Sequence, residues 1–136
     1  MSAGVATYLL DTGWIVRHLR GQQAYTESIA RLASGGLAVS IISVAELQEG
    51  VTLAKNRDRA AQSLATFLTS VAILPVEEET CRIFGELSAK LHNKGNHPGY
   101  FDALIAATAL QHQLTVLTTD ADDFSRFEEL TIVTVP

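Results

Sequence analysis

The sequence predicts an α/β sandwich with a mainly parallel central sheet. Short runs of strand-forming residues alternate along the chain with longer runs of helical periodicity, which is the pattern of helices packed on a parallel sheet. Apolar residues make up 47% of the chain and charged residues 18%, so a buried core can form. The length of 136 residues suits one domain, residues 1–136, and is short for two.

The first elements are expected to be a strand and two helices. Thr7–Leu10 (TYLL) has the composition of a strand that ends at Asp11, and a helix is expected around Trp14–Leu19. Tyr25–Ala33 predicts a second helix, because two glycines at positions 35 and 36 form a stop signal just after it.

The middle of the chain predicts a buried strand and two helices. Leu37–Ile42 (LAVSII) has the length and the β-branched content of a buried strand. We expect Ser43 to cap the following helix, because Glu46 three residues later would complete a capping box. Asn56–Leu68 predicts the next helix.

The second half of the chain continues the alternation and contains no repeat or interdomain linker. Its expected elements are, in order, the strand Val71–Val76, the helices Glu77–Asn93 and Tyr100–His112, and the strands Leu114–Leu117 and Leu130–Val135.

Three acidic residues follow the predicted strands. Asp11 comes directly after the first strand, Glu46 lies early in the helix after the second, and Asp120 comes shortly after Leu114–Leu117. Ligands of open parallel sheets bind at the carboxyl ends of the strands. Acids from distant parts of the sequence are therefore expected to meet at one edge of the sheet.

Asp102 precedes Ala103–Leu110 (ALIAATAL), a segment that is apolar on nearly all sides and should be buried. A carboxylate here could cap the helix, because it would accept hydrogen bonds from free backbone N–H groups. Alternatively, it could belong to the acidic site. The pattern alone leaves both interpretations open.

Helical geometry separates two glutamates of one helix. Successive residues of an α-helix are about 100° apart, so Val44, Leu47, Val51 and Ala54 share an apolar face. Glu46 falls at the border of this face beside Gly50, which leaves room for a ligand, and Glu49 falls nearly opposite. We expect Glu46 to be functional and Glu49 to face water.

The acidic run at positions 120–123 offers two candidates. It could be no more than a turn that caps a short helix. As functional acids, Asp120 lies nearest the strand end and Asp123 lies one helical turn further on, whereas Asp122 is expected to face water.

Meeting carboxylates would require compensation. Two carboxylates about 5 Å apart repel by roughly 3 kcal/mol at an effective dielectric constant near 20. Four of them have six pairings, roughly 20 kcal/mol, which exceeds the ~5–15 kcal/mol stability of a typical domain. Hard cations or shifted pKa values must offset this repulsion. Carboxylate ligands without cysteine or clustered histidine favour Mg²⁺ or Mn²⁺ over zinc.

The composition limits the cellular compartments and the classes of protein that fit this chain. The single Cys81 excludes an intrachain disulfide and cysteine-rich zinc modules, and it suits the cytoplasm. No apolar run approaches a membrane span, and we expect no signal peptide at the start of the chain. The net charge of −5 opposes nucleic-acid binding unless metal ions change the local sign.

Four short motifs resemble those of the PIN-domain ribonucleases, and in particular the VapC toxins of bacterial toxin–antitoxin pairs. In chain order, they are Leu9-Leu10-Asp11-Thr12, then Ser43-Val44-Ala45-Glu46-Leu47 with Gly50, then Asp102-Ala103-Leu104-Ile105-Ala106-Ala107-Thr108-Ala109, and finally Leu117-Thr118-Thr119-Asp120 with Asp123-Phe124. Each motif is weak alone, but the four in this order and spacing are specific. They cover nearly the whole chain.

The resemblance implies a three-layer α/β/α PIN fold and an endoribonuclease dependent on Mg²⁺ or Mn²⁺. It implies catalytic acids at Asp11, Glu46, Asp102 and at Asp120 or Asp123, with Asp11, Glu46, Asp102 and Asp120 as metal ligands. The ions would lower the pKa of a bound water and stabilise charge on the scissile phosphate, leaving 5′-phosphate and 3′-hydroxyl ends. Further implications are an RNA substrate, a cognate VapB-type antitoxin and a homodimer.

The chain departs from the family at Gly13, where Asn or Ser is usual, and it has both Asp120 and Asp123 where one acid is common. Surface cations could bind flanking phosphates of RNA, although each is more simply a solvated charge. They are Arg17, Arg20, Lys90, Lys94 and His97.

Two other functions fit part of the pattern. One is a PIN-like protein that binds a partner but cleaves RNA poorly or not at all, because Gly13 weakens its nuclease site. Leu10-Asp11-Thr12-Gly13 is also the signature of aspartic proteases, which pair two such aspartates. The proteases, however, are nearly all β and have a small residue where this chain has Trp14.

Overall fold

The computed structural model describes residues 6–96, 99–134 and 136 and forms a single five-stranded sheet with helices on both sides. The strands are β1 (Tyr8–Leu10), β2 (Leu37–Ser40), β3 (Ala72–Leu74), β4 (Thr115–Leu117) and β5 (Ile132–Val133). The α-helices are α1 (Thr12–Leu19), α2 (Gln23–Leu32), α3 (Ile41–Leu53), α4 (Arg57–Leu68), α5 (Glu78–Asn93), α6 (Tyr100–His112) and α7 (Ala121–Ser125), and a short 3₁₀ helix spans Ala33–Gly35. No helix in these ranges is long and apolar enough to cross a membrane.

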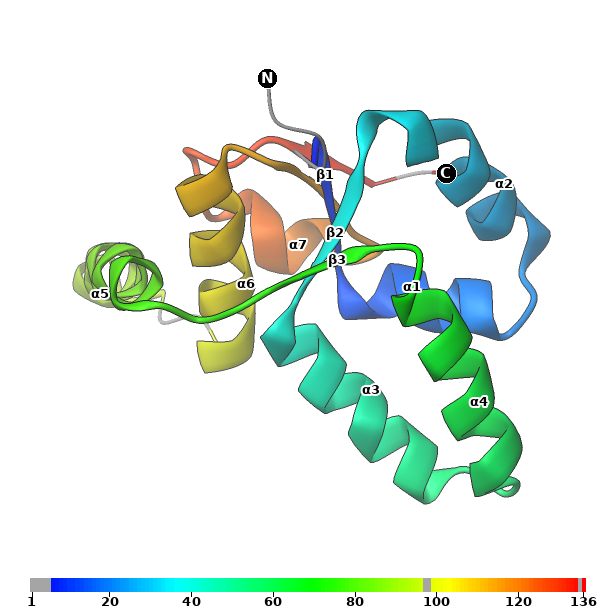
Figure 1. Ribbon diagram of the computed structural model, residues 1–136. Helices are drawn as coiled ribbons and strands as arrows, with labels where there is room; N and C mark the ends of the chain where they lie inside the picture. Colours follow the sequence, from blue (N-terminus) through cyan, green and yellow to red (C-terminus); the bar gives the residue numbers. More distant parts are fainter. Residues whose placement is uncertain (1–5, 97–98, 135) are drawn as a thin grey trace.

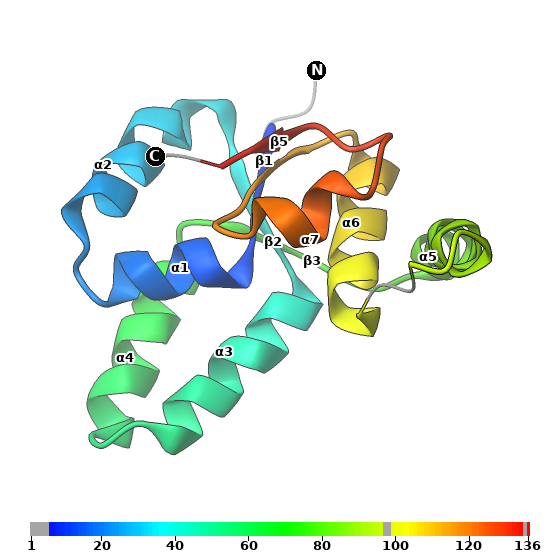
Figure 2. The same ribbon diagram turned by 180° about the vertical axis from the view of Figure 1, so that it is seen from behind.

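All paired strands run parallel, in the order β3-β2-β1-β4-β5. Helices α1, α2 and α4 lie on one side of the sheet, and α5, α6 and α7 lie on the other (Figures 1 and 2). The expected three-layer α/β/α sandwich is therefore confirmed. The parallel topology also removes the aspartic-protease interpretation, which requires a nearly all-β fold.

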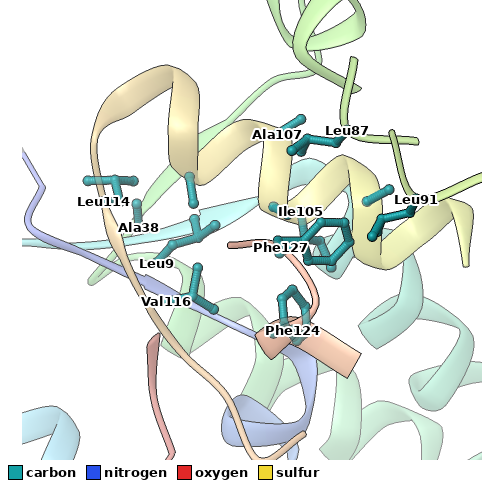
Figure 3. Close-up of a cluster of buried hydrophobic side chains, with 13 residues drawn as sticks. Leu9, Ala38, Leu87, Leu91, Ile105, Ala107, Leu114, Val116, Phe124 and Phe127 are labelled. Carbon is teal, nitrogen blue, oxygen red and sulfur yellow. The ribbon is translucent and has the colours of Figure 1, made fainter. Parts of the chain in front are cut away.

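Successive strand residues point to opposite faces of the sheet, and this alternation builds two cores. Leu9, Ala38 and Val116 pack against α5, α6 and α7, where Leu87, Ile105 and Phe124 lie (Figure 3). Their neighbours Leu10, Val39 and Leu117 face the other side and pack with Trp14, Leu64 and Phe67 of α1 and α4. Because helices cover both faces of the sheet, the sequences of these strands are nearly continuous apolar runs.

The order of the strands positions the functional edge. Strand β1 lies at the centre, between β2 and β4, with Leu9 paired to Ala38 on one side and Val116 on the other. The chain leaves these strands at Asp11, Ile41 and Thr118, on the same edge of the sheet because the strands are parallel. The segments after the strands therefore lie next to one another.

Most element boundaries agree with the sequence prediction within two residues, but the start of α3 does not. The strand predicted to reach Ile42 ends at Ser40, and the helix starts at Ile41. Ser40 is the N-cap, because its hydroxyl accepts a hydrogen bond of 3.0 Å from the Ile42 N–H. The predicted cap at Ser43, with its capping box to Glu46, is wrong, since Ser43 lies buried within the helix. The sequence prediction missed this boundary because Leu37–Ile42 is a nearly continuous apolar run that gives no sign of where the strand ends.

Replacing Ser40 with alanine should lower the free energy of unfolding by about 1 kcal/mol, the usual effect of losing an N-cap. Denaturant unfolding would measure the change, with Ser125→Ala, at an exposed serine, as the control. An unchanged midpoint for Ser40→Ala would contradict the assigned start of α3.

Candidate acidic site

Asp11 is the most enclosed acid of the site, with 7% of its surface exposed. It follows β1 and caps α1: Oδ1 accepts a hydrogen bond of 2.8 Å from the Thr12 N–H. Oδ2 accepts a hydrogen bond of 2.8 Å from the Thr118 hydroxyl, at the end of β4. Burial raises the pKa of Asp11, these two hydrogen bonds lower it, and the charges of Glu46 and Asp120 raise it. The carboxylate is thus held in one orientation by two elements.

Glu46 is joined to the start of α1 by a side-chain network. The Thr12 hydroxyl donates to Glu46 Oε1 over 2.7 Å and is hydrogen-bonded to Ser43 Oγ at 2.9 Å. Thr12 directly follows Asp11, so one residue bonds to both acids, through its N–H and its hydroxyl. Glu46 is half-buried and Glu49 is exposed, which agrees with the prediction from helical geometry.

Asp102 is the third residue of α6, which begins at Tyr100 with Gly99 as its N-cap. The interpretation of Asp102 as the N-cap is therefore wrong. Its carboxyl is half-buried, and its pKa is raised to about 6, chiefly by burial and then by the charges of Asp11, Asp123, Asp120 and Glu46. Because the charges of four other acids act on Asp102, its carboxyl group lies among them, although the five acids come from four separate segments of the sequence.

The two remaining acids have different partners. Asp120 caps α7, because its Oδ1 accepts a hydrogen bond of 3.2 Å from the Asp123 N–H. Asp123 Oδ1 lies 2.6 Å from Nη2 of Arg126. A hydrogen bond between the two carboxyls raises the pKa of Asp120 and lowers that of Asp123, and Arg126 lowers the latter further. Asp123 is thus already paired with a cation, whereas Asp120 retains more of its capacity to bind one.

The structure places the other four predicted acids close enough to Asp102 for their charges to act on it, but it does not arrange the five as a finished metal site. Among the residues described, no group of three or more histidine, cysteine, aspartate or glutamate side chains is close enough to hold a metal ion. The donor chemistry nevertheless fits a hard cation, because every donor is a carboxylate oxygen. In the part of the chain that the structure describes, Arg126 is the one cation found in an ion pair with these acids.

The predicted phosphate-binding cations have other partners or lie beside a groove. Lys90 pairs with Glu128 and Glu129, and Lys94 with Glu128, which favours their interpretation as surface charges. Arg17 lies over the ring of Tyr25, 5.5 Å from its centroid. Arg20 lines a groove of about 570 Å³ between α1, α3 and α4, and this groove reaches Glu46. His97 lies outside the described residues.

Three residues of the site carried no predicted role. Thr118 orients Asp11, Thr12 links Asp11 to Glu46, and Arg126 neutralises Asp123. Thr12 directly follows Asp11 and Thr118 lies two residues before Asp120, and this nearness to predicted acids was the available signal. Nothing in the sequence pattern indicated Arg126, because its role depends on the short helix α7.

The fold and the acids at its central edge define an α/β protein with a carboxylate site after β1. The chain belongs to the PIN-domain family, whose model matches residues 8–130. Ribonuclease VapC2 of Rickettsia felis is 31% identical over 90% of this chain and 93% of its own length. Ribonuclease VapC5 of Mycobacterium tuberculosis is 34% identical over 94% of this chain and 93% of its own length.

A solved structure resembles the whole described fold. It is the VapBC2 complex of Rickettsia felis, bound to a DNA fragment from its promoter, in which the matching chain is 29% identical. The match covers 93% of this chain and 97% of that one, with a TM-score of 0.88.

The raised pKa of Asp102 predicts how stability depends on pH. Above pH 6 the folded protein holds this carboxylate charged among other acids, which is unfavourable. As the pH falls from 6 toward the ordinary value of 3.8, the folded state binds a proton that the unfolded state does not, so its relative stability rises. In chelator, Asp102→Asn should therefore melt above the wild type at pH 7.5, and this advantage should shrink between pH 6 and pH 4.

Thermal melts of both proteins across this pH range would measure the difference. The other raised carboxyls are present in both proteins, so the difference isolates Asp102. A difference that stays constant with pH would show that the Asp102 carboxyl titrates normally.

Proposed function

We propose that this protein is a metal-dependent endoribonuclease of the VapC type and the toxin of a toxin–antitoxin pair. One observation carries the proposal: within a PIN-domain fold, Asp11 is buried and oriented at the end of the central strand, in electrostatic range of Glu46, Asp102 and Asp120. The relatives named ribonuclease VapC2 and ribonuclease VapC5 match over nearly their whole length, which supports RNA as the substrate.

Asp11, Glu46, Asp102 and Asp120 would hold Mg²⁺ or Mn²⁺. Hard oxygen ligands suit these ions, and a cation would relieve the repulsion that raises the pKa of Asp102. When bound, the ion supplies an activated water and stabilises negative charge on the phosphate. Asp123, paired with Arg126, would contribute by holding Asp120 and α7 in place rather than by binding metal.

The residues around the acids would orient them. Thr118 and the Thr12 N–H bind separate oxygens of Asp11, so this carboxylate cannot rotate without losing a hydrogen bond. The Thr12 hydroxyl holds Glu46 in the same way. Such fixed orientation matters because hydrolysis needs the phosphate and the attacking water aligned.

The antitoxin would seat in the groove between α1, α3 and α4. Its walls are mainly apolar, with Leu53 78% exposed, and Glu46 lies in its lining. A segment bound there would lie beside the acidic site and could block it. The solved complex of the similar Rickettsia felis proteins supports a partner of the VapB type. The expected homodimer and the cytoplasmic location stay predictions.

Cleavage should depend on Glu46 and not on Glu49, which lies one turn away on the exposed face of α3. With total RNA and Mn²⁺ or Mg²⁺, Glu46→Gln should lower the rate at least a hundredfold, the order expected when an electrostatic contact to the reaction is lost. Glu49→Gln should stay within a few-fold. Gel analysis of fragments over time would measure both rates.

Asp11→Asn is the inactive reference, and expression of the wild type without a partner should arrest growth while this variant should not. Equal loss of cleavage in the two glutamine variants would contradict the assigned roles. Growth arrest by Asp11→Asn would contradict toxicity through RNA cleavage.

Metal binding should raise the melting temperature of the wild type. A ligand that binds only the folded state, at a hundredfold excess over its Kd, stabilises it by about 2.7 kcal/mol. Millimolar Mn²⁺ should therefore raise the melting temperature by several degrees relative to chelator, and the increase should be smaller for Asp102→Asn. Calorimetry would measure both, with Glu49→Gln as the matched surface control. Equal increases in all three proteins would argue against Asp102 as a ligand.

A further inference from the structure

Gly13 is the second residue of α1, a position at which glycine is not required by the backbone. The glycines with positive φ in the described ranges are Gly21, Gly36 and Gly95, and Gly13 is not among them. Glycine is also a poorer helix former than alanine. The reason for glycine here is space: a Cβ built on Gly13 would collide with Oγ1 of Thr119, and Thr119 Cβ would lie 3.7 Å away.

The backbone on both sides of Thr119 is held in place. The Thr118 N–H donates a hydrogen bond of 3.0 Å to the Val133 carbonyl, and the Thr118 hydroxyl donates one to Asp11. The Asp120 N–H donates to Thr118 Oγ1 over 2.9 Å, and Asp120 caps α7. Thr119 lies between these anchored residues, half-buried, with its side chain against the first turn of α1.

The Thr119 hydroxyl can donate a hydrogen bond, and Thr119 directly precedes Asp120. In the part of the chain that the structure describes, no hydrogen bond to this hydroxyl is found, whereas the hydroxyls of Thr118 and Thr12 are engaged by Asp11 and Glu46. This hydroxyl occupies the space beside the Gly13 backbone, and a Cβ at position 13 would displace it. Gly13 follows Asp11 by two residues and Thr119 directly precedes Asp120, so the contact adjoins two acids of the site in the sequence.

We propose that Thr119 contacts the RNA substrate, donating a hydrogen bond from Oγ1 to an oxygen of its backbone, and that Gly13 keeps the space in which this hydroxyl stands. The hydroxyl thus takes the place of a polar side chain at position 13. This inference rests on the proposed ribonuclease function and adds to it a substrate-binding pair formed by α1 and the turn after β4.

The test compares the kcat/KM of RNA cleavage for wild type, Thr119→Ser, Thr119→Ala, Gly13→Ala and the double alanine variant. Thr119→Ala removes the hydroxyl and should lower kcat/KM about tenfold, whereas Thr119→Ser retains it and should stay within about twofold. Gly13→Ala should also lose about tenfold, because its Cβ pushes Oγ1 away. The double variant should be no worse than about tenfold, since both changes remove the same contact.

Thermal melts supply a readout that does not depend on activity. Gly13→Ala should raise the melting temperature more in the Thr119→Ala background than in the wild type, because the favourable helix propensity of alanine is then gained without a collision. All variants should remain folded, so a loss of cleavage cannot be attributed to unfolding.

Several outcomes would overturn the inference. They are cleavage by Thr119→Ala within twofold of the wild type, Thr119→Ser as impaired as Thr119→Ala, or losses that multiply to about a hundredfold in the double variant. A folded wild type that cleaves no RNA under any divalent ion would instead contradict the proposed function itself, and the two failures are therefore distinguishable.

Discussion

The repulsion among carboxylates gathered at one sheet edge is the constraint on which the rest of the site depends. Five acids from four segments of the chain meet there, and burial together with the charges of the other four raises the pKa of Asp102. The protein offsets part of this repulsion with donors: Thr118 and the Thr12 N–H bind Asp11, the Thr12 hydroxyl binds Glu46, and Arg126 pairs with Asp123. The remaining charge of the site is negative, which agrees with the proposal that it binds a divalent cation.

The sheet makes this arrangement possible because the burial of its apolar side chains stabilises the fold against the repulsion among the acids. Leu9 and Leu10, next to each other in β1, are both fully buried and belong to two different cores. Burying an apolar side chain of this size contributes roughly 1.5–3 kcal/mol. The central strand is therefore fixed by packing on both faces of the sheet, and Asp11 directly follows it. The most buried acid of the site is therefore attached to a strand that is packed on both of its faces.

Hydroxyl side chains form much of the hydrogen bonding around the acids. Thr12, Ser43, Thr118 and Thr119 surround the acids, and each of the first three bonds to an acid or to a residue that does. Gly13 belongs to the same arrangement, because its missing side chain is what admits Thr119. Gly13 and Thr119 are thus in direct contact, although more than a hundred residues separate them in the chain.

The sequence by itself determined the fold class, the order of the elements and the identity of the acids. Hydrophobic periodicity is a local property, and each acid has a place in a local pattern: Asp11 and Asp120 follow strands, and Glu46 and Asp102 lie early in helices. The elements and the candidate acids could therefore be predicted from the residues. Only the tertiary structure decided that Ser40 rather than Ser43 starts α3, that Asp102 is not a cap, that Asp123 is paired with Arg126, and that Thr119 occupies the space at Gly13. These features depend on where a helix begins within an unbroken apolar run, or on contacts between side chains far apart in the sequence. Such contacts are set by the packing of the whole sheet, which no local pattern contains.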